Sequence, residues 1–237
     1  MKPARTYDDL NRVLAKFVPN VGIVSYEYDI IGIEEGCVAE KSTDPKGNIT
    51  TKIFDRAGRL SSVIDGTISS KQKTIYEYYD NGNTKSVTYP TGIKEEYTYY
   101  PDNTLWTLTN KKADGTVLDI YTYTYDNANN QKTKYEVIAG VIKGTTTYTY
   151  DNLNRLETIT EPSGRKTSYL YDRAGNRLTE TITLGTQSTK NTYLYNEQNR
   201  LMEITTRESG VLPKTTKFEY DNNGNQLTTT SISYLPD

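Results

Sequence analysis

Aromatic and polar positions alternate along the chain in a pattern that returns at regular intervals. The fullest form is YLYDRAGNRL at residues 169–178, and FEYDNNGNQL at residues 218–227 is nearly a copy. Successive copies begin 21 to 26 residues apart. The aromatic before each turn, taken as the anchor of its repeat, is found at Tyr7, Tyr28, Phe54, Tyr78, Tyr99, Tyr125, Tyr150, Tyr171, Tyr195 and Tyr220. An unbroken period in the twenties indicates a repeat architecture.

Each repeat predicts a strand, a tight turn and a second strand. Tyr169 and Tyr171 stand at i and i+2, so on a strand they share one face. Asp172 suits the first corner of a type I turn, and Gly175 tolerates a positive φ three residues later. The same spacing recurs at Asp8/Asn11, Asp29/Gly32, Asp55/Gly58, Asp126/Asn129, Asp151/Asn154 and Asn196/Asn199. Two central repeats depart from it, with Tyr79 and Tyr100-Pro101 where Asp is expected.

The return strands end at a second set of turn signals. These are Asp65-Gly66, Pro90-Thr91-Gly92, Asp114-Gly115, Gly140 or Gly144, Pro162-Ser163-Gly164, Gly185 and Gly210. Ten hairpins with turns at both ends give about twenty antiparallel strands, so the predicted fold class is all-β. Leu156 and Ile159 would not share a face on a regular strand, which predicts a bulge or a change of register.

A longer period overlies the hairpins. The 21-residue intervals fall at every third repeat, and each contains a proline 12 residues after its anchor: Pro19, Pro90 and Pro162. Anchors three repeats apart are separated by 70 to 72 residues. Duplication of a three-hairpin block and one geometric step of a spiral both account for this superperiod.

Composition favours an ordered β protein with a thin core. The formal net charge is only −2, and 37 Thr and 22 Tyr make up a quarter of the 237 residues. Both residue types fit a pleated, half-buried surface. Charges of both signs are interspersed, so no basic stripe for nucleic acid is present.

The ionisable side chains argue against an enzyme. The sequence has no His, which excludes His-based catalysis and imidazole metal ligands, and its one cysteine, Cys37, excludes an internal disulfide. We expect Cys37 to be a small buried residue. The acid pairs Glu34/Glu35 and Glu95/Glu96 are adjacent, so on strands they would point to opposite faces, a poor arrangement for a two-carboxylate glycosidase. No catalytic, cofactor-binding or metal-binding residue is predicted.

Three ligand-like features have simpler structural interpretations. DNNGN at 221–225 and DNANN at 126–130 begin like calcium loops, but they lack the distal Glu and fall where a hairpin needs its turn. The paired tyrosines could stack on sugars, but a cross-strand ladder filling the thin core is the favoured interpretation. Trp106, on a return strand, is expected to be packed rather than to serve as a ligand platform.

Targeting signals are not evident. No apolar run approaches the roughly 20 residues of a membrane span. The first residues, MKPARTYDDLNR, lack the apolar segment of a secretory signal.

The motif Tyr-x-Tyr-Asp-x-x-Gly-Asn-Arg-Leu resembles the YD repeat of Rhs proteins, of the B and C components of Tc insecticidal toxins, of WapA proteins and of teneurins. The resemblance extends from Tyr7 to Leu227, and it makes residues 1–237 a single repeat array. It implies hairpins joined side by side into a spiralling antiparallel sheet, a partial shell or barrel. In bacterial members the shell encloses a toxic C-terminal domain, and the setting is secreted or at the cell surface.

The sequence departs from that family in two ways that argue against a complete toxin-enclosing shell. No segment between Asp221 and Asp237 resembles the aspartate-bearing core that releases the toxin. Twenty strands give only about 95 Å of sheet, which is small for enclosing a folded domain. We therefore expect a piece of a shell, or a small stand-alone relative. The alternative is a surface adhesion module that holds a glycan or a protein. Unpaired edge strands predict that the chain closes on itself or associates with further copies.

Overall fold

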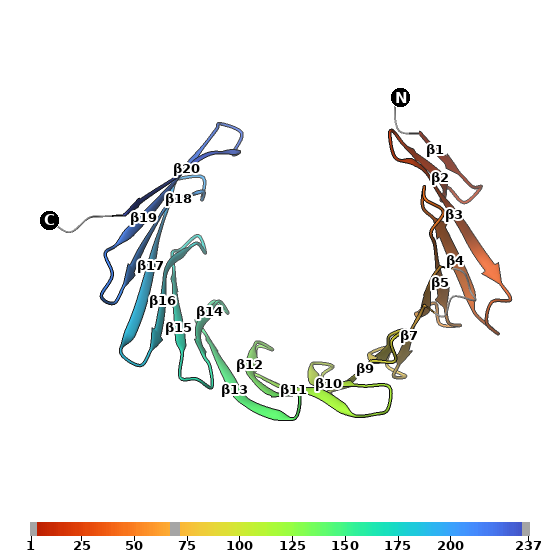
Figure 1. The fold of residues 1–237 in the computed structure, drawn as a ribbon, viewed down its shortest axis with the longest axis horizontal. Coiled ribbons are helices and arrows are strands. Elements are labelled where there is room, and N and C mark those ends of the chain that lie inside the picture. Colours follow the sequence, from red (N-terminus) through yellow and green to blue (C-terminus); the bar gives the residue numbers. More distant parts are fainter. Residues whose placement is uncertain (1–3, 67–71, 234–237) are drawn as a thin grey trace. The chain divides into compact units, whose positions relative to one another are not determined.

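The computed structural model describes residues 4–66 and 72–233, and in this part of the chain the fold is all-β (Figure 1). Twenty strands belong to one antiparallel sheet. Their bounds are β1 Ala4–Tyr7, β2 Val13–Val18, β3 Gly22–Ile31, β4 Val38–Thr43, β5 Ile49–Phe54, β6 Leu60–Asp65, β7 Lys73–Tyr78, β8 Thr84–Thr88, β9 Lys94–Tyr99, β10 Leu105–Lys111, β11 Val117–Tyr125, β12 Gln131–Ile138, β13 Val141–Tyr150, β14 Leu156–Thr160, β15 Lys166–Tyr171, β16 Arg177–Leu184, β17 Gln187–Tyr195, β18 Leu201–Glu208, β19 Lys214–Tyr220 and β20 Gln226–Ser233.

The chain divides into two compact units, Met1–Ile120 and Tyr121–Asp237. In the first unit, each strand from β1 to β9 pairs with the next one along the chain. In the second unit the same succession runs from β12 to β20. The predicted hairpin architecture is thus confirmed, whereas the single array over residues 1–237 stays a prediction.

The predicted anchors mark the ends of strands. Nine of the ten are the last residue of their strand, and Tyr28 is the exception. Immediately after the anchor Tyr171, the Asp172 N–H donates to the Asn176 carbonyl at 2.9 Å, and the Gly175 N–H donates to the Asp172 carbonyl at 3.3 Å. Gly175 has a φ of 90°, the positive value that the sequence pattern requires there.

A bulge follows each regular turn and explains the imperfect alternation of the return strands. Between β15 and β16, Tyr171 pairs with Arg177 and Leu170 with Thr179, so Leu178 is an extra, unpaired residue. The equivalent shift between β13 and β14 leaves one residue unpaired after Leu156. Leu156 therefore shares its face with Ile159 after all, as a bulge predicts.

The second hairpin differs from the prediction. No turn forms at Asp29/Gly32, because β3 continues to Ile31, and Asp29 itself adopts a φ of 55° within a register shift. The apolar pair Ile30 and Ile31 stays in the ladder, opposite Ala39 and Val38. Extending the ladder keeps Ile30 against the apolar cluster around Ala39, and the chain reverses later, at residues 32–37.

The proline signals correspond to compact connections between hairpins. Pro90 and Pro162 are the second residues of five-residue turns with the same hydrogen bonds as the Asp turns. The strands beside them have five or six residues, whereas β12, β13, β16 and β17 have eight to ten. Short strands explain the two 21-residue intervals that contain Pro90 and Pro162. A turn of this kind at Asp44–Asn48 was missed, and the Asp65-Gly66 connection runs into residues 67–71, outside the described part.

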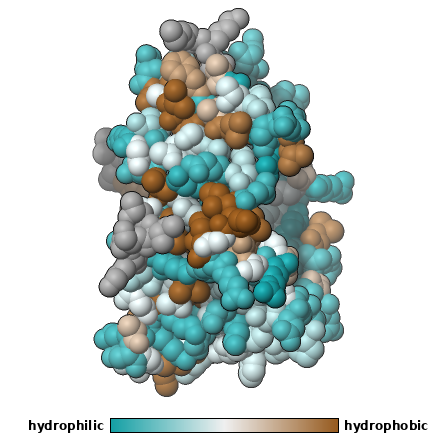
Figure 2. Space-filling model, turned by 90° about the vertical axis from the view of Figure 1, so that its right-hand side faces the viewer, coloured by the Kyte–Doolittle hydropathy of each residue, from teal (hydrophilic) through white to brown (hydrophobic). Residues whose placement is uncertain are grey.

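The apolar core is small. Ala39, Ile53 and Ile64 form a buried cluster, and the half-buried Cys37 packs against it from the loop after β3. Elsewhere the most buried positions include threonines and serines: Thr51, Ser62, Ser86, Thr146, Thr167 and Thr215. Figure 2 shows the remaining apolar side chains of one face as separate patches among polar ones. With so little apolar volume, the polar contacts between hairpins carry much of the structural specificity.

Candidate functional site

The repeated motif residues meet at the hairpin turns, where the carboxylate closes the turn. In the turn that begins at Asp151, Oδ1 accepts the backbone N–H groups of Leu153 at 2.9 Å and Arg155 at 3.0 Å. The Arg155 backbone N–H is the first cause that holds the pKa of Asp151 below its usual value. The backbone N–H of the arginine four positions later likewise lowers the pKa of Asp8 and Asp55. For Asp44, Asp126, Asp172 and Asp221 the first cause of a lowered pKa is the side-chain amide of the asparagine at that position. The carboxylates are therefore ionised and engaged by their own turns.

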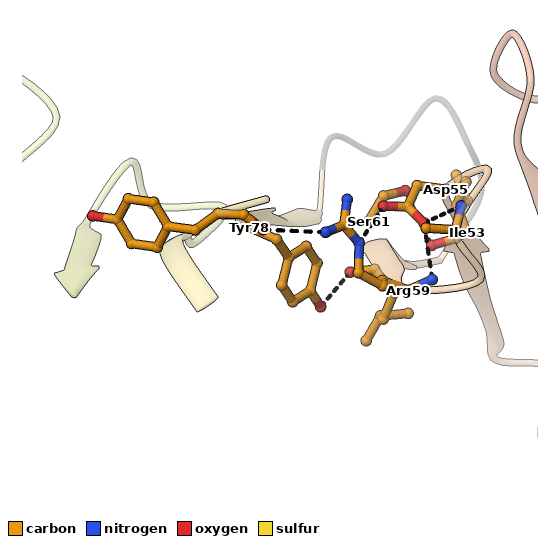
Figure 3. A network of polar contacts seen from close by, with 8 residues as sticks. Ile53, Asp55, Arg59, Ser61 and Tyr78 are labelled. Atoms are coloured by element: carbon orange, nitrogen blue, oxygen red, sulfur yellow. Dashed lines mark hydrogen bonds and ion pairs between the residues drawn. The ribbon is translucent and has the colours of Figure 1, made fainter. Parts of the chain in front are cut away.

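The residue four positions after the Asp links its turn to the next hairpin. The Arg59 Nε donates to Asp55 Oδ2 at 2.8 Å, and its NH1 donates to the Tyr79 carbonyl at 3.3 Å (Figure 3). Its guanidinium carbon lies 4.8 Å from the centre of the Tyr78 ring. One arginine thus makes an ion pair, an inter-hairpin hydrogen bond and a cation–π contact.

Arg155 repeats this arrangement in the second unit. It pairs with Asp151 at 2.7 Å, donates to the Asp172 carbonyl at 2.9 Å and lies 4.7 Å from the Tyr171 ring centre. Arg12 stacks likewise on Tyr28 and forms ion pairs at 2.7 Å with Asp8 and Asp29. The predicted ladder of tyrosines is therefore wrong in its detail, because Arg12, Arg59 and Arg155 each lie over one of the anchor rings.

Where the residue four positions after the Asp is asparagine, its side-chain amide links the turn to the next hairpin. Asn176 Nδ2 donates to Asp172 Oδ2 at 2.9 Å and to Asn199 Oδ1, in the next hairpin, at 2.8 Å. Asn130 likewise joins Asp126 to Asn154.

The anchor tyrosines add a second link between hairpins. The Tyr171 hydroxyl donates to the Leu156 carbonyl at 2.8 Å, across to the return strand of the preceding hairpin. Tyr28, Tyr78, Tyr150 and Tyr220 make the equivalent bond to the residue six positions after the preceding anchor. Phe54, which has no hydroxyl, is the anchor that follows the irregular second hairpin.

The two calcium-like segments are turns of this kind. Asp221 Oδ1 accepts the N–H groups of Asn223 and Asn225, and its Oδ2 accepts the Asn225 amide. Asp126 has the same three interactions. Over residues 4–66 and 72–233, no group of three or more His, Cys, Asp or Glu side chains is placed to hold a metal ion.

The acid pairs are engaged separately. Glu34 and Glu35 lie in the loop after β3 rather than on a strand, which corrects the expectation, and Glu34 forms an ion pair with Lys73. On β9, Glu95 accepts hydrogen bonds from two tyrosine hydroxyls, whereas Glu96 forms an ion pair with Lys111 at 2.6 Å. Neither pair presents two carboxylates across a shared gap.

The two departing repeats keep the turn but line it with aromatic rings. Tyr79 and Tyr100 take the Asp position. Each still donates its backbone N–H to the carbonyl four residues later, and its own carbonyl accepts the N–H three residues later. Trp106 is the unpaired bulge residue of β10 and is 46% exposed. Trp106 packs against Tyr100, with ring centres 5.8 Å apart, but its exposure shows that it is not fully packed as expected. These rings line an open groove, which sequence analysis did not find because it joins two separate turns.

Twenty strands whose hairpins share a repeated turn define a tandem β-hairpin repeat protein. Comparisons with known proteins show which solved structures have a similar fold. No protein-family model matches the sequence, and no curated protein matches it. Solved structures do match. The crystal structure of TcdB2-TccC3-Cdc42 matches 98% of this chain at 17% identity with a TM-score of 0.59, and the match covers 16% of that chain.

Two further structures agree. A variant of the Photorhabdus luminescens Tc holotoxin pore gives a TM-score of 0.58 at 16% identity, covering 95% of this chain and 16% of that one. The crystal structure of TcdB2-TccC3-TEV gives 0.55 at 15% identity, with 95% and 17% covered. The resemblance to the hairpin repeats of Tc toxin components is thereby confirmed at the level of the fold. The chain spans about one sixth of the length of these structures. No helix in its described part is long and apolar enough to cross a membrane.

Proposed function

We propose that the chain is a non-catalytic structural module that forms or extends a β-shell of the YD type. The observation that carries this proposal is the use of the motif itself. The Asp, Arg or Asn, and Tyr side chains of the repeat bond to their own turn or to the adjacent hairpin, as the Asp151–Arg155–Tyr171 contacts illustrate. These motif side chains are thus engaged in closing turns and joining hairpins.

The module extends through its strand edges. Among the described residues, β1 pairs with β2 and β20 with β19, and no further partner is found for either strand. All described residues of β20 from Gln226 to Ser233 are exposed. An unpaired edge offers N–H and C=O groups to another strand. We propose that a second copy of the chain continues the sheet there.

The wider setting follows from the same proposal. A shell built from such hairpins would enclose a folded domain, as the family resemblance implies for bacterial members, and it would be secreted or act at the cell surface. The chain matches about one sixth of each of the Tc structures. It would therefore contribute one sector of such a wall.

Light scattering across a concentration series, followed by electron microscopy, tests the proposal. The expected result is a mass that rises with concentration and regular assemblies containing continuous β-sheet. Hydrogen exchange should show amides of β1 and β20 becoming protected as the assemblies form. A monomer at every concentration with freely exchanging terminal strands, or irregular aggregates alone, would contradict the proposal.

A second candidate function is binding of a glycan at a surface. The observation that favours glycan binding is the aromatic groove beside Trp106. Binding at this one groove is compatible with a structural role for the rest of the chain.

A further inference from the structure

The departures from the repeat are concentrated in one place. The position after the anchor holds Asp or Asn in eight of ten repeats, and the two exceptions, Tyr79 and Tyr100, lie in consecutive hairpins. The exposed bulge residue beside them is Trp106, the only tryptophan of the chain. The turns close normally, with Asn81 and Asp102 side chains accepting the N–H that the usual Asp would accept. Turn geometry therefore gives no reason for three aromatic residues here.

These residues line an open groove of about 570 Å³ between the Tyr79 and Tyr100 turns. The Tyr100 and Trp106 ring centres lie 5.8 Å apart with their planes tilted by 38°. Tyr79 meets Tyr99 edge to face, with ring centres 6.2 Å apart. The Tyr79 hydroxyl is fixed by a 2.9 Å bond to the Tyr97 carbonyl. The aromatic surface is thus held in position.

Amide groups stand on the same groove. Asn81 and Asn83 each donate from Nδ2 to Asn103 Oδ1 at 2.9 Å, which holds the three side chains together. An amide nitrogen carries two hydrogens, so each donor of this cluster has a second N–H to offer. Asp80 adds a carboxylate, and none of the described residues that line the groove is a lysine or an arginine.

This combination matches the chemistry of a sugar. One face of a pyranose ring presents C–H groups that pack on an aromatic ring, and its hydroxyls pair with amides and carboxylates. Four of the ten residues that line the groove are aromatic and five are polar, and aromatic surface combined with placed polar groups is typical of small-molecule binding. We propose that the groove beside Trp106 binds a neutral saccharide, an inference that rests on the second candidate function above and gives it a site and a ligand class.

The next regular pair of turns provides an internal comparison. Between the turns that begin at Asp126 and Asp151 lies a groove of about 390 Å³. Three tyrosines line it, Tyr125, Tyr148 and Tyr150, but Asp126 holds the turn position, Lys132 adds a positive charge, and no tryptophan is present. The regular repeat therefore builds a smaller groove that lacks the Tyr100–Trp106 pair, and no saccharide is expected there.

Trp106 fluorescence reports on the groove directly, because no other tryptophan contributes. The full chain is titrated with maltotriose, cellotriose, mannotriose and triacetylchitotriose, and with choline chloride as a cation that could use the rings by cation–π contact. A saturable shift or quenching with at least one trisaccharide, and none with choline, is the expected result. The absence of any saturable change with the sugars, or a response to choline instead, would overturn the proposal.

Variants that restore the repeat pattern then locate the site. Trp106→Leu introduces the residue found at the same bulge position as Leu14, Leu178 and Leu227, and Tyr100→Asp restores the usual turn residue. Asn103→Gly removes an amide while tolerating the φ of 68° at that position. Calorimetry should show at least about tenfold weaker binding, equivalent to about 1.4 kcal/mol, for each variant that keeps the parent's thermal midpoint.

Leu178→Ala is the matched control, since it alters an exposed bulge residue in another hairpin, and it should bind as the parent does. Equal loss in Leu178→Ala, or parent-like affinity in the folded Trp106→Leu and Tyr100→Asp variants, would show that the groove is not the site.

Discussion

At the scale of single residues, the aspartate of the repeat is a structural group. Asp172 accepts the Asn176 backbone N–H at 2.8 Å and the Asn176 amide at 2.9 Å. Asp172→Ala removes both bonds, so the thermal midpoint should fall by a few degrees. Asp172→Asn should cost less, because Asn196 serves the same position and still accepts two backbone N–H groups. A midpoint unchanged in Asp172→Ala, measured by circular dichroism, would contradict this role.

The turn carboxylates also predict a pH dependence. Hydrogen bonds, led by that from the Asn176 side chain for Asp172, lower the folded-state pKa values of these groups. A carboxyl whose pKa is lower in the folded state stabilises the fold above its unfolded pKa, about 3.9, and this contribution is lost as pH falls through the folded value. The thermal midpoint should therefore be flat near neutrality and decline below about pH 4. A midpoint that rises on acidification through that range would count against it.

The turn was predictable from residue types, but the partners of its last residue were not. Asp followed by Gly or Asn three positions later requires one backbone geometry. That Arg59 also reaches Tyr79 depends on the neighbouring hairpin, 20 residues along the chain. Trp106 was misjudged for the same reason, since its exposure follows from the bulge and from the next turn.

At the scale of the element, each hairpin is held to its neighbour by the anchor hydroxyl. Tyr171→Phe removes the bond to the Leu156 carbonyl and should lower the free energy of unfolding by about 1 kcal/mol, which is roughly 2–4 °C in the thermal midpoint. Phe54→Tyr is the matched reverse change. It should bring no comparable gain, because the preceding hairpin has a loop where the accepting carbonyl would be. Equal and opposite effects in the two variants, measured by chemical denaturation, would contradict this explanation.

Hairpin positions were predictable because every repeat carries its own turn. The turn of the second hairpin was predicted at the wrong place, because apolar packing there outweighs the turn-forming residues. Asp29 and Gly32 have the correct spacing, but Ile30 packs against the buried cluster around Ala39 when the ladder continues past Asp29. Local chemistry and packing compete there, and the sequence pattern describes only the first.

At the scale of the molecule, one register joins successive hairpins. The residue eight positions after an anchor pairs with the residue three before the next anchor in seven junctions: Ala15/Ser25, Ser62/Ile75, Ser86/Glu96, Thr133/Thr147, Thr158/Ser168, Thr179/Thr192 and Glu203/Lys217. A second copy that continues the sheet by this rule would place Ala4 of its β1 opposite Thr228 on β20. This register therefore predicts one specific contact between copies, Ala4 opposite Thr228.

Cysteine cross-linking between copies tests that contact, and with it the central claim that the module extends a sheet. In a Cys37→Ser background, Ala4→Cys is combined with Thr228→Cys, and the control combines Ala4→Cys with Thr229→Cys. Facing residues of an antiparallel pair are close enough for a disulfide, whereas a one-residue slip moves a side chain to the other face. Under mild oxidation, the Ala4→Cys/Thr228→Cys protein should form a ladder of covalent oligomers on a non-reducing gel, and the control should remain monomeric. Equal cross-linking of both proteins, or of neither, would contradict the account.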